Sequence, residues 1–143
     1  MQRRSLMLAA LGSLVAATTL RAADAVAAAD AKAVRALIEA QLAAFASDDA
    51  DKAFSLAAPA IQTMFVNADR FLAMVRESYP VVYRPASVGF LQPEWIDGKL
   101  FQRVQMSDAA GARWTVVYQL ERQADRSWRI AGCVAGRSQA RSV

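Results

Sequence analysis

The chain has 143 residues, of which 55% are apolar and 21% charged, and this composition indicates one globular domain and excludes a disordered chain. Its net charge of +4 comes from Lys and Arg residues that form no run, so a nucleic-acid-binding patch is not expected. The absence of histidine removes the commonest general base and metal ligand, and we expect neither a metal nor a cofactor.

Residues 1–25 have the layout of a cleaved export signal. Arg3 and Arg4 form a basic start, an uncharged run rich in Leu, Ala and Val follows over residues 6–20, and Ala23 and Ala25 fit a cleavage site. The run is shorter than the roughly 20 residues of a membrane-spanning helix, which leaves an uncleaved anchor as the weaker alternative. The paired arginines fit a twin-arginine signal, and that route and the general secretory route both stay open.

Cleavage would place the mature chain in the periplasm or outside the cell, with no membrane span. It would lower the net charge from +4 to +2, because residues 1–25 contain three arginines and one aspartate. We expect a single domain over residues 26–135 and a flexible polar tail over residues 136–143.

The first helix is predicted over residues 30–46, with Asp30 as its cap. Its apolar positions follow helical spacing: Val34, Leu37, Ile38, Leu42 and Phe45. Gln41 lies near the centre of this apolar stripe and should point inward. Either it makes a structural hydrogen bond to a neighbouring backbone group, or it lines a cavity.

Three shorter helices are predicted over residues 50–57, 59–65 and 68–79. Asp48 and Asp49 precede the first of them, and capping explains this acidic pair better than paired catalytic carboxylates or a metal site do. Pro59 fits the first turn of the second helix, and Asn67 caps the third. The methionines of these helices are interpreted as core filler.

Residues 81–85 follow Pro80 and end with Pro85, and they are predicted to be extended, as an edge strand or a linker. Arg84 in this segment has two interpretations. It either receives an anionic group of a ligand or pairs with an acidic residue of a helix.

The second half of the chain predicts four antiparallel strands, over residues 87–96, 99–107, 114–121 and 128–134. The dipeptide Asp97-Gly98 indicates a tight hairpin between the first two. Strict alternation puts one set of residues on the inward face: Leu100, Gln102, Val104, Met106, Trp114, Val116, Tyr118 and Leu120. In the last strand it assigns Trp128, Ile130, Gly132 and Val134 to one face and Arg129, Ala131 and Cys133 to the other. Cys133 is interpreted as a buried, inert thiol.

These elements predict an α+β fold in which N-terminal helices cover one face of a curved four-stranded antiparallel meander. This order of elements resembles the nuclear-transport-factor-two-like fold, a cone of sheet and helices around a pocket. The chain also resembles the domain of unknown function 4864 family of small exported bacterial proteins, which implies fold and compartment but no reaction. The resemblance is carried by Ile38, Gln41, Leu42, Phe45, Asp49, Phe54, Phe71, Met74, Val75, Tyr79 to Arg84 (with any residue at 81), and Trp128 to Cys133.

A pocket inside the cone is the expected ligand site. Its candidate residues are Gln41, Tyr79, Tyr83, Arg84, Gln102, Trp114 and Tyr118, although large aromatic side chains also commonly fill a core. The first hypothesis is a non-catalytic binding or accessory module for a small apolar ligand. The alternatives are a protein-interaction domain that uses the outer sheet face (Phe101, Val117 and Ala131), as a monomer or weak homodimer, and an isomerase or hydrolase that uses Tyr and Gln.

Overall fold

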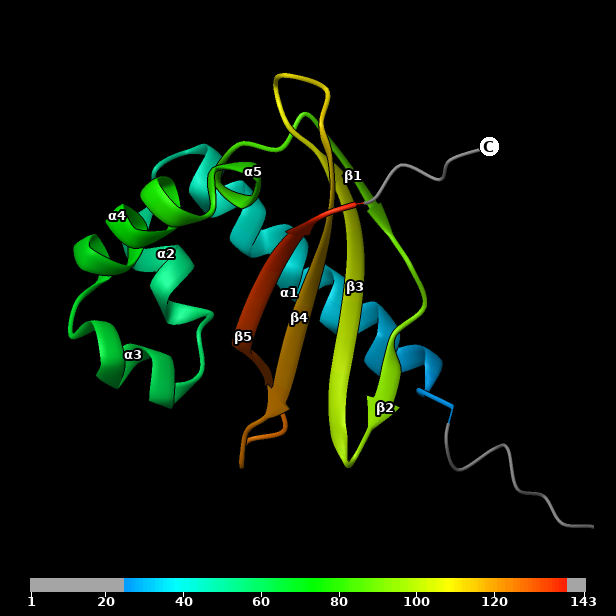
Figure 1. Cartoon of the computed structure of the whole chain (residues 1–143). Coiled ribbons are helices and arrows are strands. Elements are labelled where there is room, and N and C mark those ends of the chain that lie inside the picture. Colours follow the sequence, from blue (N-terminus) through cyan, green and yellow to red (C-terminus); the bar gives the residue numbers. More distant parts are fainter. Residues whose placement is uncertain (1–24, 139–143) are drawn as a thin grey trace, which may run out of the picture.

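The computed structural model describes residues 25–138, and the predicted signal residues Arg3, Arg4 and Ala23 lie outside this range. The described chain is an α+β structure of helices followed by an antiparallel sheet (Figure 1). The helices are α1 (Ala28–Ala46), α2 (Ala50–Ser55), α3 (Pro59–Phe65), α4 (Ala68–Ser78) and α5 (Pro80–Tyr83). The strands are β1 (Ser87–Phe90), β2 (Glu94–Ile96), β3 (Lys99–Ser107), β4 (Arg113–Arg122) and β5 (Trp128–Arg137).

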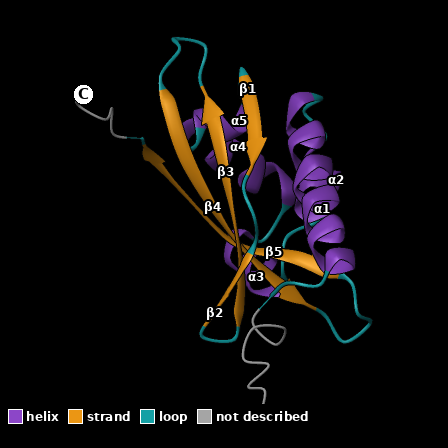
Figure 2. Cartoon of the chain, turned by 90° about the vertical axis from the view of Figure 1, so that its right-hand side faces the viewer, coloured by secondary structure: helices purple, strands orange, loops and turns teal. Residues whose placement is uncertain are grey.

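The long helix α1 covers one face of the sheet, while α2, α3 and α4 gather beside the edge formed by β5 (Figures 1 and 2). Val34 and Ile38 of α1 are completely buried against the sheet side of the core, as their spacing predicts. The helix begins at Ala28, before Asp30, and no side chain caps it. The alanine-rich start favours helix by itself, and Asp30 pairs instead with Arg122 of β4.

The caps of two later helices are confirmed. The carboxylate of Asp49 accepts a hydrogen bond from the Lys52 N–H at 3.1 Å, and the side chain of Asn67 accepts one from the Arg70 N–H at 2.9 Å. Each cap fixes where the chain turns between successive helices. These turns place α2, α3 and α4 side by side at one end of the molecule.

The prediction of an extended segment after Pro80 is wrong, because residues 80–83 form the single helical turn α5. Proline is compatible with the first position of a helix, and burial of Val81 and Val82 in the core stabilises the turn. The turn ends at Arg84, which precedes Pro85 and has φ −143° and ψ 71°.

The sheet has five strands, where the sequence predicts four, and its order is β1-β3-β4-β5 with β2 also paired to β3. The predicted strand over residues 87–96 splits at Pro93, which has no N–H for a ladder hydrogen bond. Both pieces run antiparallel to β3 at successive positions along it. The predicted Asp97-Gly98 hairpin is confirmed, with φ of 49° and 75° at its two central residues.

The inward alternation of β3 and β4 is confirmed, but that of β5 changes within the strand. Leu120 pairs with Ile130 and Gln119 pairs with Gly132, so Ala131 is an extra residue that forms a β-bulge. A bulge shifts every later side chain to the opposite face. Cys133 therefore shares the inward face with its partner Tyr118, and Val134 points outward with 68% of its surface exposed.

The strand β5 also continues further than expected. It extends to Arg137, although the predicted tail begins at residue 136, and the Ser138 N–H donates to the Arg113 carbonyl at 2.9 Å. Pairing with β4 holds Gly136 and Arg137 in the sheet, so two residues of the predicted tail are strand.

Candidate apolar ligand site

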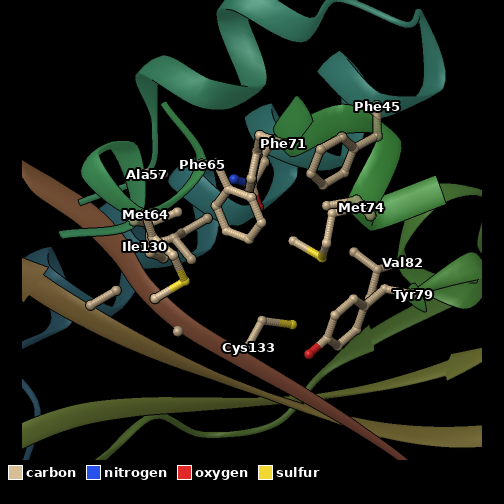
Figure 3. Close-up of a pocket in the computed structure, with 15 residues that line it drawn as sticks. Phe45, Ala57, Met64, Phe65, Phe71, Met74, Tyr79, Val82, Ile130 and Cys133 are labelled. Atoms are coloured by element: carbon tan, nitrogen blue, oxygen red, sulfur yellow. The ribbon is translucent and has the colours of Figure 1, made fainter. Parts of the chain in front are cut away.

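A pocket of about 260 Å³ lies between the helices and the edge strand β5 (Figure 3). Its wall combines α1, α3, α4, α5 and the first half of β5. The lining side chains are Gln41, Phe45, Ala57, Ile61, Met64, Phe65, Phe71, Met74, Val75, Tyr79, Val82, Ile130, Ala131 and Cys133, with Gly132 contributing backbone. The volume is slightly below the roughly 300–1,000 Å³ of small-molecule sites, and none of the lining residues carries a charge.

A cluster of phenylalanine rings forms the helical side of the pocket. The ring centre of Phe71 lies 6.0 Å from that of Phe45 and 5.6 Å from those of Phe54 and Phe65. These separations are typical of tilted and edge-to-face aromatic pairs. Because the four rings come from four helices, Phe71 joins the helical wall into one packed unit.

Flexible sulfur-containing side chains form another part of the wall. Met64 and Met74 project from α3 and α4, and Figure 3 shows Met74 facing Cys133 across the cavity. Thioether side chains adapt their shape to irregular apolar ligands and make favourable contacts with aromatic rings. Burial raises the pKa of the Cys133 thiol to about 12, so the thiol stays protonated at neutral pH.

Of the predicted ligand-binding residues, Gln41 and Tyr79 line this pocket. The Gln41 amide Nε2 donates to the Ala53 carbonyl at 3.3 Å, so its structural hydrogen bond and its place in the cavity wall occur together. Tyr79 follows α4, and Figure 3 shows its ring beside Val82 with the hydroxyl on the side of Cys133. The structure thus brings these two candidates together.

Tyr83 and Arg84 lie outside the pocket lining, in a cluster around Asp48. The Tyr83 hydroxyl donates to one Asp48 oxygen, and the Arg84 guanidinium contacts the other oxygen at 3.3 Å and also donates to the Phe45 carbonyl. The Tyr83 hydroxyl first, and then Arg84, lower the pKa of Asp48 below its usual value. Arg84 therefore has an acidic residue and the carbonyl at the end of α1 as its partners.

Gln102 and Trp114 also make internal contacts away from the pocket. The Gln102 Nε2 donates to the carbonyls of Leu91 and Arg103 at 2.7 and 2.8 Å, which holds the connection between β1 and β2 against β3. The Trp114 Nε1–H donates to Asp108 at 2.9 Å. This hydrogen bond is the largest cause of the lowered pKa of Asp108.

Tyr118 is completely buried beside Cys133, and its hydroxyl has no hydrogen-bond partner among the described residues. Burial raises the pKa of this phenol well above its usual value of about 10, so the hydroxyl does not ionise at neutral pH. Tyr118 therefore cannot act as a phenolate base in this environment.

Replacing Tyr118 with phenylalanine should raise the free energy of unfolding by about 1 kcal/mol, because it removes a buried polar group that no partner satisfies. Tyr83→Phe is the matched control. It deletes a hydroxyl that donates to Asp48, and it should lower stability slightly. Urea unfolding of both variants measures the difference; a loss of stability in Tyr118→Phe as large as that in Tyr83→Phe would contradict an unpaired hydroxyl.

Sequence reasoning missed most of the pocket wall. The sequence predicts Met64 and Met74 as core filler, Cys133 as an inert thiol and Ala131 on the outer sheet face, whereas all four line the pocket. For Cys133 the reason is the bulge at Ala131, which turns the following residues of β5 to the opposite face. No pattern in the sequence places Met64 and Met74 in one wall, because they lie in different helices, α3 and α4, whose relative position is set by tertiary packing.

Within residues 25–138, no group of three or more His, Cys, Asp or Glu side chains is arranged to hold a metal ion. In the same part of the chain, no helix has the length and apolar character needed to cross a membrane.

The fold and the pocket define a small α+β domain with an uncharged apolar cavity at one sheet edge. The model of the family "Domain of unknown function (DUF4864)" matches residues 27–143, which is most of the chain, and the chain belongs to this family. Neither the curated proteins nor the solved structures contain a match.

Proposed function

We propose that this chain is a non-catalytic binding module that holds one small, uncharged, apolar ligand in the pocket between α3, α4 and β5. The observation that carries the proposal is the lining itself, in which aromatic rings and thioethers surround the cavity and no side chain is charged. The wall has no His, Asp, Glu, Lys or Arg side chain, and the thiol of Cys133 is held protonated. Burial of ligand surface supplies the binding free energy.

The pocket also offers polar groups that orient a ligand. The Tyr79 side chain ends in a hydroxyl, and Gln41 carries an amide whose carbonyl oxygen remains for a second hydrogen bond after Nε2 has bonded Ala53. A few polar groups in an apolar wall are typical of small-molecule sites. The interaction of the module with a ligand therefore needs neither Arg84 nor Asp48.

The exported location, in the periplasm or outside the cell, is part of this proposal and rests on the pattern of residues 1–25. The cone of the nuclear-transport-factor-two-like fold and the monomeric or weakly dimeric state also stay predictions.

Titration with 1-methylnaphthalene, an uncharged apolar probe, tests the proposal. We expect saturable shifts of the amide NMR signals of pocket residues, and we expect Met74→Trp to weaken binding at least about tenfold because the indole occupies the cavity. Val134→Trp is the matched control, since it adds the same side chain to an exposed position of β5 and should leave binding unchanged. Equal weakening by both variants, or shifts spread over the whole protein surface, would refute a pocket-bound ligand.

A further inference from the structure

The β5 side of the pocket is formed partly by backbone. Gly132 lines the cavity without a side chain, and its neighbours Ala131 and Cys133 line it as well. The lining helices α3 and α4 lie beyond the free edge of β5 rather than over the sheet (Figure 1). Polar groups on that edge therefore border an otherwise apolar cavity.

The hydrogen-bond alternation of the sheet fixes the direction in which the Cys133 backbone points. The Arg103 carbonyl accepts a hydrogen bond from the Leu91 N–H, so the backbone N–H and C=O of Arg103 point away from β4. Those of its neighbour Gln102 therefore point toward β4. Tyr118 is the partner of Gln102, and its backbone N–H and C=O therefore form their hydrogen bonds with β3. Its partner on the other side, Cys133, is not bonded to β4, and its N–H and C=O point to the free edge.

Two other hydrogen bonds give the same alternation. The Ser138 N–H donates to the Arg113 carbonyl, so the backbone N–H and C=O of Arg113 point toward β5. These groups alternate in direction along a strand, so those of Tyr118, an odd number of residues further on, point away from β5. On the other side of the bulge, the backbone N–H and C=O of Ile130 point to the outer edge of β5, where both are hydrogen-bonded. No described residue bonds the N–H or C=O of Cys133 on this edge.

At Ile130, the preceding edge-facing position of β5, a segment of the same chain already pairs with this edge. The Leu56 carbonyl accepts from the Ile130 N–H at 2.9 Å, and the Ala58 N–H donates to the Ile130 carbonyl at 2.8 Å. Ala57, flanked by these two amides, lies parallel to Ile130 and is itself completely buried. The segment ends there because Pro59 begins α3, and the edge stays open at Cys133.

We propose that the pocket binds an apolar amino-acid residue flanked by two amides, which pairs with the free backbone of Cys133 as Ala57 pairs with Ile130. This inference rests on the proposed function and adds the chemical class of the ligand. One amide carbonyl of the ligand accepts from the Cys133 N–H, and the other amide N–H donates to the Cys133 carbonyl. The apolar side chain of the ligand points to the same face as the Cys133 side chain and enters the cavity.

A matched pair of probes tests the two amides. N-acetyl-phenylalanine methylamide carries both N–H groups, and methyl O-acetyl-3-phenyllactate has the same shape with ester oxygens in their place. We expect the amide to bind about two- to tenfold more tightly, because the ester leaves the Cys133 carbonyl unpaired. The amide proton of Cys133 should shift on binding, and its hydrogen exchange should slow.

The outcomes separate this inference from the function on which it rests. If 1-methylnaphthalene binds in the pocket and the two phenyl probes bind equally or not at all, the amide class is wrong and the apolar pocket stands. If none of the three compounds binds, both proposals are wrong. A tighter amide that leaves the Cys133 signal unchanged overturns the assignment to this edge.

Discussion

Replacing Phe71 with alanine is expected to lower the free energy of unfolding by about 3–5 kcal/mol. The ring is 6% exposed and contacts the rings of Phe45, Phe54 and Phe65, which come from three other helices. Its loss leaves a void beside the existing pocket, and the aromatic pair contacts disappear with it. Urea unfolding followed by circular dichroism measures the change.

Met64→Ala is the control for Phe71→Ala, because Met64 also borders the pocket but is 72% exposed. Its truncation removes little buried surface, and we expect a change within about 0.5 kcal/mol. If the two variants had equal stability, the phenylalanine cluster would not be the unit that holds the helices together. The comparison shows whether stability depends on a buried, packed side chain or on any side chain that lines the pocket.

The second large effect is expected for Gln102→Met, at a cost of about 1–3 kcal/mol. Methionine keeps the length and volume of the side chain but removes the donor that bonds the carbonyls of Leu91 and Arg103. Gln102 is 1% exposed, so water cannot readily replace that donor. Thermal and urea unfolding should both show the loss, and amides of β1 and β2 should exchange faster.

Gln105→Met is the matched control on the same strand. Its side chain is exposed on the other face of β3, where a small change within about 0.5 kcal/mol is expected. A loss in Gln105→Met as large as in Gln102→Met would show that strand propensity, not the buried hydrogen bonds, determines the result.

Local patterns predicted the elements that depend on neighbours in sequence. The alternation in β3 and β4 indicated their buried faces, because successive side chains in a strand point to opposite sides. The sequence likewise predicted the caps Asp49 and Asn67 and the Asp97-Gly98 turn, because a cap or a tight turn forms its hydrogen bonds within a few residues.

The same patterns failed where tertiary contacts determine the local structure or the position of a side chain. The turn α5 forms because Val81 and Val82 can be buried under the helices, which overrides the extended preference expected between two prolines. Pairing with β3 is interrupted near Pro93, so the first predicted strand becomes two. Of the candidate site residues, only Gln41 and Tyr79 border the pocket. The other five have different surroundings: Tyr83 and Arg84 bond Asp48, Gln102 bonds the Leu91 carbonyl, Trp114 bonds Asp108, and Tyr118 is buried in the core.

The amino-acid sequence by itself determined an α+β chain of helices before strands, with an apolar sheet face and no histidine to support common acid–base chemistry. Tertiary structure alone decided where the cavity lies and what borders it. One extra residue at Ala131 reverses the faces of β5 and brings Cys133 to the pocket, and the free β5 edge exists only because Leu56–Ala58 stops at Pro59. The bulge depends on the register between β4 and β5, and the extent of the free edge depends on pairing between segments more than 70 residues apart (Leu56 to Ile130); no local pattern encodes either.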